Sequence, residues 1–182
     1  EILDLGFRAA WKKRVTEGAQ ADGTLGKEGW KKILRVSVEA GGLPKGFPFE
    51  DYFEEVYAHF ARPDAWRDFP ETEGVLTGLQ ARGIRTGILS NWDPRLRQVL
   101  AGFGWAERLD PVLISEEVGA EKPGQEIFRK AEQAGGFVAG ECALVGDDPI
   151  SDRQGAEAAG WRWALVSRPE TGLGEALVSL GL

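Results

Sequence analysis

The stretch CALVGDDPISDRQGAEAAG, residues 142–160, decides how the rest of this sequence is interpreted. It opens with a short apolar run that predicts a buried strand, turns at Gly146, and continues as an Ala-rich helix that ends at Gly160. The loop between strand and helix holds three carboxylates: Asp147, Asp148 and Asp152. Because three negative charges at the end of a buried strand repel one another, we expect a cation or a basic side chain beside them. The alternative is a solvated acidic turn that caps a helix.

Composition narrows the classes of protein to consider. The chain has 182 residues, of which 42% are hydrophobic and 28% charged, as is usual for a globular protein. A net charge of −7 without a cluster of Lys or Arg argues against a nucleic-acid partner. We find no signal peptide and no apolar run near the ~18 residues that a membrane span needs. The single cysteine, Cys142, allows no internal disulfide, which favours a cytoplasmic location, and we expect it to be an inert core residue.

The order of patterns along the chain predicts two parts. Residues 1–17, 27–40 and 49–61 carry apolar side chains at helical spacing, and no strand pattern occurs among them. From about residue 70 strands alternate with helices. We expect the strands at residues 84–89, 112–114, 142–145 and 161–166. One helix should end at Gly83, and four more should occupy residues 94–103, 124–134, 153–159 and 173–180. We therefore predict an all-helical subdomain at residues 1–68. An α/β core at 69–182 should hold a parallel sheet covered on both faces.

Chemically useful side chains follow three of the predicted strands. Ser90, Asn91 and Trp92 come after the first strand, Lys122 after the second, and the acidic loop after the third. Alone, Ser90 and Asn91 would be turn residues and Lys122 a solvated surface lysine. Because the carboxyl ends of parallel strands meet at one edge of a sheet, we expect these groups to converge. A hydroxyl, a lysine and an acidic cluster suit phosphoryl transfer with Mg²⁺ held by oxygen ligands.

Three segments resemble a known family. LSNWD (89–93), EKPGQEIF (121–128) and VGDDPISDRQGAEAAG (145–160) are similar to motifs II, III and IV of the haloacid dehalogenase-like (HAD) hydrolase superfamily. The likeness extends over nearly the whole chain, with the motifs in order and suitably spaced. It is strongest to the subfamily in which a helical cap is inserted after the first core strand. The resemblance implies a Rossmann-like parallel-sheet core with an all-helical cap.

The resemblance also implies roles for the candidate residues. Ser90 would contact the phosphoryl group, and Asn91 would support the same anion site. Lys122 would steady the nucleophile and the phosphate. Apart from the resemblance, Trp92 directly follows the Ser90–Asn91 pair, so we expect it to line the entrance. Among the acidic residues, Asp147 would ligate Mg²⁺ and Asp152 would either ligate the metal or orient Lys122. Asp148 stands where the family often has Ser or Asn, and it is the third acidic residue that we expect at the metal.

One family motif is missing from the sequence. Motif I is a strand followed by Asp-x-Asp, in which the first Asp is the nucleophile, and no segment here has that pattern. QADGTL (20–25) mimics its second half, but Gln20 stands at the nucleophile position and no apolar strand precedes it, so we expect a cap loop. The sequence contains no Met and begins with Glu1. We therefore expect the first core strand and the nucleophile to lie upstream, and the printed chain alone to be inactive.

Several functions remain open at this stage. The first is an Mg²⁺-dependent phosphatase that acts on a small phosphorylated metabolite through an aspartyl-phosphate. The second is a 2-haloacid dehalogenase, in which Asp attacks carbon without a metal, and the third is an inactive HAD-like binding module. A receiver- or flavodoxin-like domain is a further alternative, against which the helical first third and the Lys122–Pro123 pair count. The substrate and the oligomeric state are not specified by the sequence.

Overall fold

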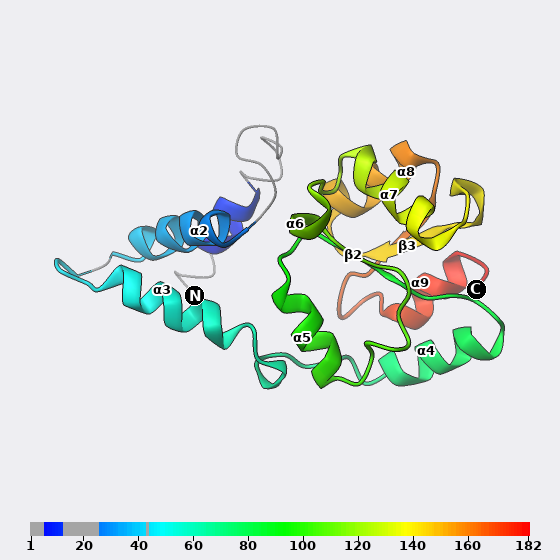
Figure 1. The fold of residues 1–182 in the computed structure, drawn as a ribbon, viewed down its shortest axis with the longest axis horizontal. Coiled ribbons are helices and arrows are strands. Elements are labelled where there is room, and N and C mark those ends of the chain that lie inside the picture. The colour runs from blue at the N-terminus through cyan, green and yellow to red at the C-terminus, as the bar shows by residue number, and fades with distance from the viewer. Residues whose placement is uncertain (1–5, 13–25, 43) are drawn as a thin grey trace.

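The computed structural model describes residues 6–12, 26–42 and 44–182. A helical part and an α/β part lie side by side, joined by the chain that follows helix α3 (Figure 1). Residues 6–12 are helical, in agreement with the helix predicted at the start of the chain. The rest of that prediction and the loop at residues 20–25 lie outside the described residues.

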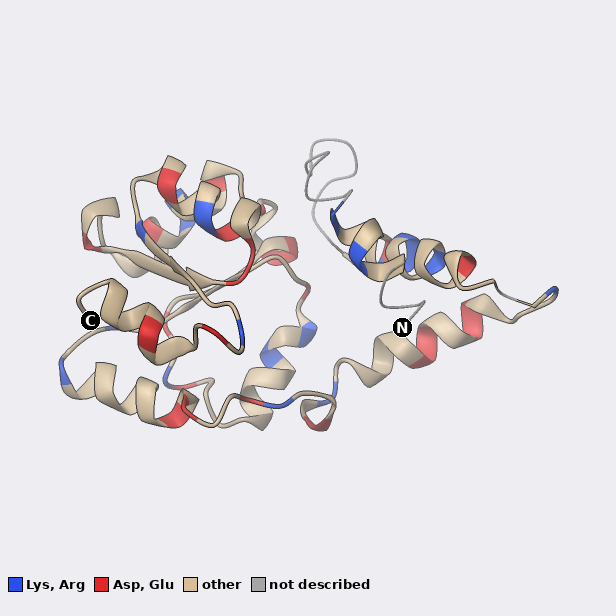
Figure 2. Cartoon of the chain, turned by 180° about the vertical axis from the view of Figure 1, so that it is seen from behind, with Lys and Arg blue, Asp and Glu red and all other residues tan. Residues whose placement is uncertain are grey.

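The helical part is built on the helix pair α2 (Lys27–Ala40) and α3 (Phe49–His59). Their apolar faces meet in a cluster around the buried residues Val38, Phe49 and Phe53. Basic residues on α2 face acidic ones on α3 (Figure 2), and ion pairs join Lys27 to Glu54 and Arg35 to Glu50. The apolar spacing that predicted both helices is therefore the spacing that packs them together.

The α/β part follows a short 3₁₀ turn, η2 (Pro63–Ala65). Its elements are, in chain order, α4 (Thr72–Ala81), β1 (Ile88–Ser90), α5 (Arg95–Gly102), β2 (Val112–Ile114), α6 (Ser115–Val118), α7 (Gln125–Gly135), η3 (Ala139–Glu141), β3 (Ala143–Gly146), η4 (Pro149–Gln154), α8 (Gly155–Ala159), β4 (Arg162–Leu165) and α9 (Leu173–Ser179). The predicted alternation of strands and helices is confirmed. One refinement is that residues 149–154 form a π-helical turn before α8.

Neighbouring residues of β2 show that helices cover both faces. Leu113 packs in a cluster with α7 and α8 residues, whereas Ile114 packs in a second cluster with Leu96 and Leu100 of α5. Successive side chains of a strand point to opposite faces, so these clusters lie on opposite sides. The part is therefore a layered α/β structure, as predicted, with α7 and α8 on one side (Figure 1).

The strands form two parallel pairs. β1 pairs with β2 and β3 pairs with β4, each in a separate two-stranded sheet. Parallel pairing in both is as predicted, but the described residues hold two small sheets where the sequence predicted one. The loops that follow β1, β2 and β3 nevertheless meet, since hydrogen bonds join Asn91 to Lys122 and Lys122 to Asp152.

The first strand is displaced from its predicted position at residues 84–89. It runs over Ile88–Ser90, and its ladder starts with Ile88 opposite Val112. Just before it, the Asp110 amide donates to the Thr86 carbonyl, and the Ile88 amide donates to the carbonyl of Pro111. Pro111 has no amide hydrogen to donate, so the regular ladder begins only after it. A proline on the partner strand thus makes the hydrogen-bonded strand shorter than the apolar run that predicted it.

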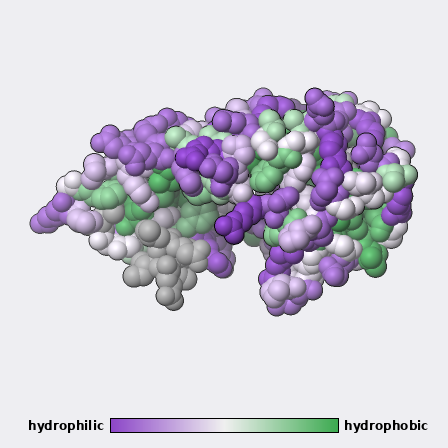
Figure 3. Space-filling model, turned by 90° about the horizontal axis from the view of Figure 1, so that it is seen from below, coloured by the Kyte–Doolittle hydropathy of each residue, from purple (hydrophilic) through white to green (hydrophobic). Residues whose placement is uncertain are grey.

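The surface is mixed in polarity. Seen from below, hydrophilic side chains spread over both halves with smaller hydrophobic areas between them (Figure 3). None of the helices within residues 6–12, 26–42 and 44–182 is long and apolar enough to span a membrane.

Candidate functional site

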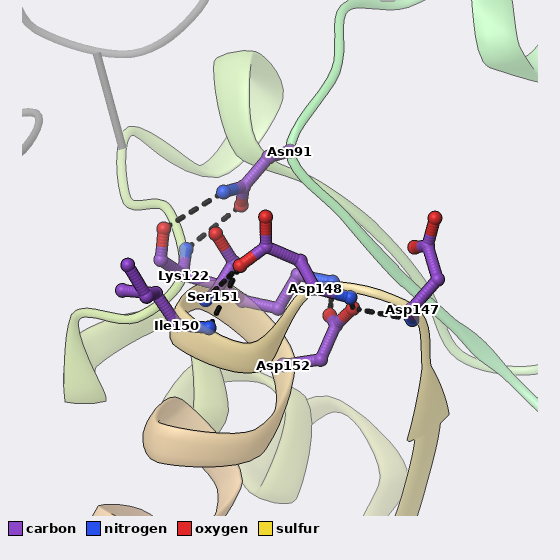
Figure 4. Close-up of polar contacts among 7 residues, drawn as sticks. All are labelled: Asn91, Lys122, Asp147, Asp148, Ile150, Ser151 and Asp152. Carbon is purple, nitrogen blue, oxygen red and sulfur yellow. Dashed lines mark hydrogen bonds and ion pairs between the residues drawn. The ribbon is translucent and has the colours of Figure 1, made fainter. Parts of the chain in front are cut away.

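The predicted site residues stand where the strands end. Ser90 is the last residue of β1, and Asn91 and Trp92 follow it. The acidic loop follows the end of β3 at Gly146, and Lys122 lies between α6 and α7, after β2. A continuous set of hydrogen bonds connects Asn91, Lys122 and the acidic loop (Figure 4). The structure therefore brings together side chains from three loops that are far apart in the sequence.

Asn91 joins the loop after β1 to the loop that carries Lys122. Its side-chain nitrogen donates to the Lys122 carbonyl over 2.7 Å, and its side-chain oxygen accepts from the Lys122 amide over 2.8 Å. Both ends of the Asn91 amide are thus engaged with one backbone unit. This fixes where the Lys122 side chain starts.

Lys122 then reaches the acidic loop. Its Nζ lies 2.5 Å from Oδ1 of Asp152, and the two side chains are only 11% and 8% exposed. A buried pair of this kind holds both charges in one geometry. Since an ammonium group carries three N–H donors, Asp152 leaves others for an anion.

Asp152 is bonded on its second oxygen as well. Oδ2 accepts from the amides of Asp147 and Asp148 at 3.0 and 2.9 Å. This contact needs Gly146, because a Cβ on that residue would lie 2.2 Å from the same oxygen. Both oxygens of the Asp152 carboxylate therefore accept hydrogen bonds, one from Lys122 and the other from two amides.

Asp148 serves as the N-cap of the following turn. Its Oδ1 accepts from the amides of Ile150 and Ser151 at 2.8 and 2.7 Å, which satisfies two donors at a helix start. The Ser151 hydroxyl is buried and has no hydrogen-bond partner among the described residues. The conformation of the loop is therefore held by hydrogen bonds from its own backbone amides to the Asp148 carboxylate.

Asp147 differs from the other two carboxylates. It is exposed, its side chain points away from Asp148 and Asp152 (Figure 4), and its carboxylate makes no hydrogen bond or ion pair within the described residues. No group of three or more His, Cys, Asp and Glu side chains in that part of the chain converges as a metal site would require. The three acidic residues thus have three different surroundings.

Ser90 and Trp92 flank Asn91. The Ser90 side chain is half-buried and has no hydrogen bond to the described residues, so its hydroxyl is available. The Trp92 ring packs edge-on against Trp66 with ring centroids 4.8 Å apart, and its buried Nε1 has no partner in the described ranges. The Trp92 carbonyl accepts from the Ser115 hydroxyl and the Glu116 amide, which ties this loop to α6.

The sequence interpretation missed a second buried pair beside this loop. Asp93 is completely buried, and Arg95 binds both of its carboxylate oxygens. Arg95 also reaches the Tyr57 carbonyl on α3, 38 positions earlier in the chain. The D-x-R spacing in residues 93–95 was visible in the sequence. That spacing gave no indication that Arg95 would contact Tyr57.

Two further groups near this pair titrate unusually. Burial raises the pKa of Tyr57 to about 12; the Arg95 charge lowers it, whereas the carboxylates of Asp93 and Glu116 raise it. Burial and then the negative charge of Asp93 raise the pKa of Glu116. In the core, burial raises the pKa of the Cys142 thiol to about 11, so this thiol is a poor nucleophile at neutral pH.

Comparison with known proteins agrees with this fold. A family model described as haloacid dehalogenase-like hydrolase matches residues 7–160. Haloacid dehalogenase-like hydrolase domain-containing protein 3 of Mus musculus is 33% identical over 148 residues, which are 81% of this chain and 59% of that protein. Phosphoserine phosphatase of Thermus thermophilus is 36% identical over 164 residues, 89% of this chain and 64% of that protein.

The fold is also similar to a solved structure. The HAD phosphatase from Thermococcus onnurineus superposes with a TM-score of 0.62 at 20% identity, covering 98% of this chain and 86% of that one. The chain spans less than two thirds of the length of the mouse relative and of the Thermus relative. The comparisons confirm the predicted fold class and the predicted family resemblance.

Proposed function

Because this chain belongs to the haloacid dehalogenase-like hydrolase family, we propose that its full-length protein is an Mg²⁺-dependent phosphatase of a small phosphorylated metabolite. The observation that carries the proposal is the buried Lys122–Asp152 pair, fixed by Asn91 at the edge where the strands end. A positive charge held there by the protein suits an anionic substrate. The similarity to a phosphoserine phosphatase supports the same choice of reaction.

In this proposal Lys122 and Ser90 bind the phosphoryl group. The N–H donors of Lys122 that Asp152 does not use would donate to phosphate oxygens, and the unpaired Ser90 hydroxyl would donate to another. Asn91 positions Lys122 through its backbone, and Trp92 lines the approach from the side of Trp66. Asp152 orients the lysine, because one of its oxygens accepts from Lys122 and the other accepts from two loop amides.

The acidic loop offers carboxylate oxygens that fit Mg²⁺. Mg²⁺ keeps several waters and binds proteins through one or two carboxylates together with substrate phosphate. Asp147 offers an exposed, unpaired carboxylate, whereas Asp148 uses one oxygen as a helix cap and can offer only the other. We assign Asp147 as the principal ligand and Asp148 as a cap. The bound ion would supply charge that offsets the phosphate.

The proposed reaction passes through an aspartyl-phosphate. A carboxylate outside the printed sequence would attack phosphorus, and the P–O bond to the substrate alcohol would break as that alcohol takes up a proton. Water would then attack the acyl-phosphate and release inorganic phosphate, restoring the carboxylate. Lys122 holds the transferred group in both steps. We further propose that residues 1–68 form a cap that selects the substrate and residues 69–182 the catalytic core.

The test is phosphate release by the full-length protein. We expect hydrolysis of p-nitrophenyl phosphate with Mg²⁺, none in EDTA, and loss of activity in Asp147→Asn with an unchanged circular dichroism spectrum. Turnover without a metal, or an unchanged Asp147→Asn variant, would contradict the proposal. Halide release from 2-chloropropionate in EDTA would replace it with the dehalogenase alternative, and no turnover of either substrate would favour the binding module.

A further inference from the structure

The two parts of the molecule have separate apolar cores. The cluster around Phe53 contains only residues of the helical part, and the clusters around Phe128 and Leu100 contain only residues of the α/β part. None of these clusters within the described residues spans both parts. Shared hydrophobic packing therefore does not fix the position of α3 relative to the strand-end loops.

A few individual contacts hold the parts together instead. Pro63 lies against Gly102 so closely that a Cβ there would be 2.1 Å from the proline ring. Trp66 packs on Trp92. These two contacts involve the connecting chain after α3 and not the helix itself. Among the described residues, α3 itself meets the α/β part through Tyr57, whose carbonyl accepts from Arg95.

The geometry of Arg95 shows how strong that contact is. Nε and Nη2 donate to the two oxygens of Asp93 at 2.8 and 2.6 Å, and Nη1 donates to the Tyr57 carbonyl at 2.6 Å. The guanidinium carbon also lies 3.4 Å from the centre of the Tyr57 ring. One side chain thus makes a bidentate ion pair, a hydrogen bond and a cation–π contact.

The Tyr57 carbonyl is an acceptor at the C-terminal end of helix α3. It belongs to the last turn of α3, where carbonyls lack partners within the helix and where a positive charge is favourable. Arg95 therefore caps α3 from another part of the chain. Each nitrogen of the guanidinium group donates to an acceptor within the protein, and the Arg95 side chain is only 13% exposed, so we assign it a structural role.

Asp93 links this clamp to the proposed phosphate site. It stands three positions after Ser90 in the loop that follows β1, and it is completely buried. Its charge needs Arg95, because a buried carboxylate without a partner is strongly unfavourable. Holding Asp93 in place thus fixes the end of the Ser90 loop, and the same guanidinium fixes α3.

We propose that Arg95 is a positioning residue that sets the placement of helix α3 over the Ser90–Asp93 loop and thereby the affinity for substrate. Its effect on affinity rests on the proposed phosphatase function. Its effect on the placement of α3 does not. Arg97, two residues further along α5, is a matched control, because it makes a bidentate pair with Glu117 inside the α/β part and does not touch α3.

The first experiment measures placement without activity. Spin labels at Glu55→Cys on α3 and Val178→Cys on α9, in a Cys142→Ala background of the full-length protein, report the distance between the two parts. We expect one narrow distance distribution for the parent and for Arg97→Ala, and a broad or displaced one for Arg95→Ala. If Arg95→Ala does not fold, Arg95→Lys decides, since it keeps a charge beside Asp93 but cannot bridge to Tyr57. An unchanged distribution in the folded Arg95 variant would overturn the proposal.

The second experiment separates positioning from chemistry. With p-nitrophenyl phosphate we expect Arg95→Lys to raise KM about tenfold, or about 1.4 kcal/mol of lost binding, and to leave kcat within about twofold. Arg97→Ala should change neither. A loss of kcat at unchanged KM would overturn the positioning role. If the parent protein hydrolyses no phosphate ester, the proposed function fails, while the distance measurement still decides the role of Arg95.

Discussion

Two buried ion pairs of this protein differ in what they connect. Lys122 and Asp152 are 30 positions apart and join two loops of the same part. Asp93 and Arg95 are two positions apart, yet Arg95 reaches back 38 positions to α3. In the first pair the cation bonds to one carboxylate, whereas in the second each nitrogen of the guanidinium donates, two to Asp93 and one to the Tyr57 carbonyl of α3. The comparison suggests that one pair serves chemistry and the other serves architecture.

The carboxylates of the two pairs also differ in burial and in the contacts that would remain without the cation. Asp152 is 8% exposed and would keep two backbone amides if Lys122 were lost, whereas the Asp93 side chain is 0% exposed and its arginine also holds the Tyr57 carbonyl. Loss of the cation should therefore cost more stability at Asp93. Loss of activity should follow the opposite order, since Lys122 lies at the proposed phosphate site.

The largest stability effect should come from Arg95→Ala. Removing the arginine leaves the buried Asp93 carboxylate without its charged partner, so the free energy of unfolding should fall by about 3–5 kcal/mol. Urea unfolding followed by circular dichroism measures this change. A loss in Lys122→Ala as large as that in Arg95→Ala would contradict the contrast drawn between the two pairs.

The largest activity effect should come from Lys122→Ala. Because the lysine supplies the fixed positive charge of the proposed site, kcat for phosphate release should fall about 10²–10³-fold. Steady-state kinetics on the full-length protein, with the urea midpoint as a check on folding, measures it. Arg97→Ala, which also removes a paired cation, is the control and should retain the parent kcat.

A smaller effect on stability should follow a change at Gly146. A Cβ at this residue would lie 2.2 Å from Asp152 Oδ2, so Gly146→Ala forces the carboxylate away from Lys122 or the strand end to shift. We expect a loss of about 1–3 kcal/mol, the usual range for overpacking, together with reduced activity. Gly140→Ala is a comparison, since a Cβ there meets nothing within 4 Å. Equal stability of the two variants would show that Asp152 is not held as described.

The smallest of these effects should come from the Asp148 cap. Asp148→Ala removes the acceptor for the amides of Ile150 and Ser151 and should cost about 1 kcal/mol, whereas Asp148→Asn retains a capping oxygen and should cost less. Thermal unfolding of the two variants measures the difference. Equal losses in both would mean that the charge of Asp148, and not its cap, stabilises the loop.

Local pattern was enough to predict most elements. α2 begins and ends at Lys27 and Ala40, and β2 at Val112 and Ile114, as apolar spacing predicted. β1 was misplaced because the strand pattern of residues 84–89 says nothing of Pro111 on its partner. The division into two small sheets likewise depends on pairing, which periodicity does not reveal.

The candidate site could also be predicted only in part, because sequence position indicates which loops meet but not which atoms bond. Because the carboxyl ends of parallel strands meet at one edge of a sheet, we predicted that Asn91, Lys122 and Asp152 converge. The structure places them in contact. The separate surroundings of the three carboxylates depend on which amides each one accepts from, and spacing alone does not determine this. The contact of Arg95 with Tyr57 could not be foreseen either, because it depends on how α3 lies against α5.

The most direct test of the proposed site compares two adjacent carboxylates. The measurement is the Mg²⁺ concentration that gives half-maximal phosphate release by the full-length protein, for Asp147→Asn and Asp148→Asn. Each variant removes one charge from the same loop, but only Asp147 is exposed and unpaired among the described residues. We predict that Asp147→Asn abolishes the Mg²⁺ response or raises that concentration about tenfold or more, and that Asp148→Asn leaves it near the parent value. The reverse result, or an equal response in both variants, would contradict the account.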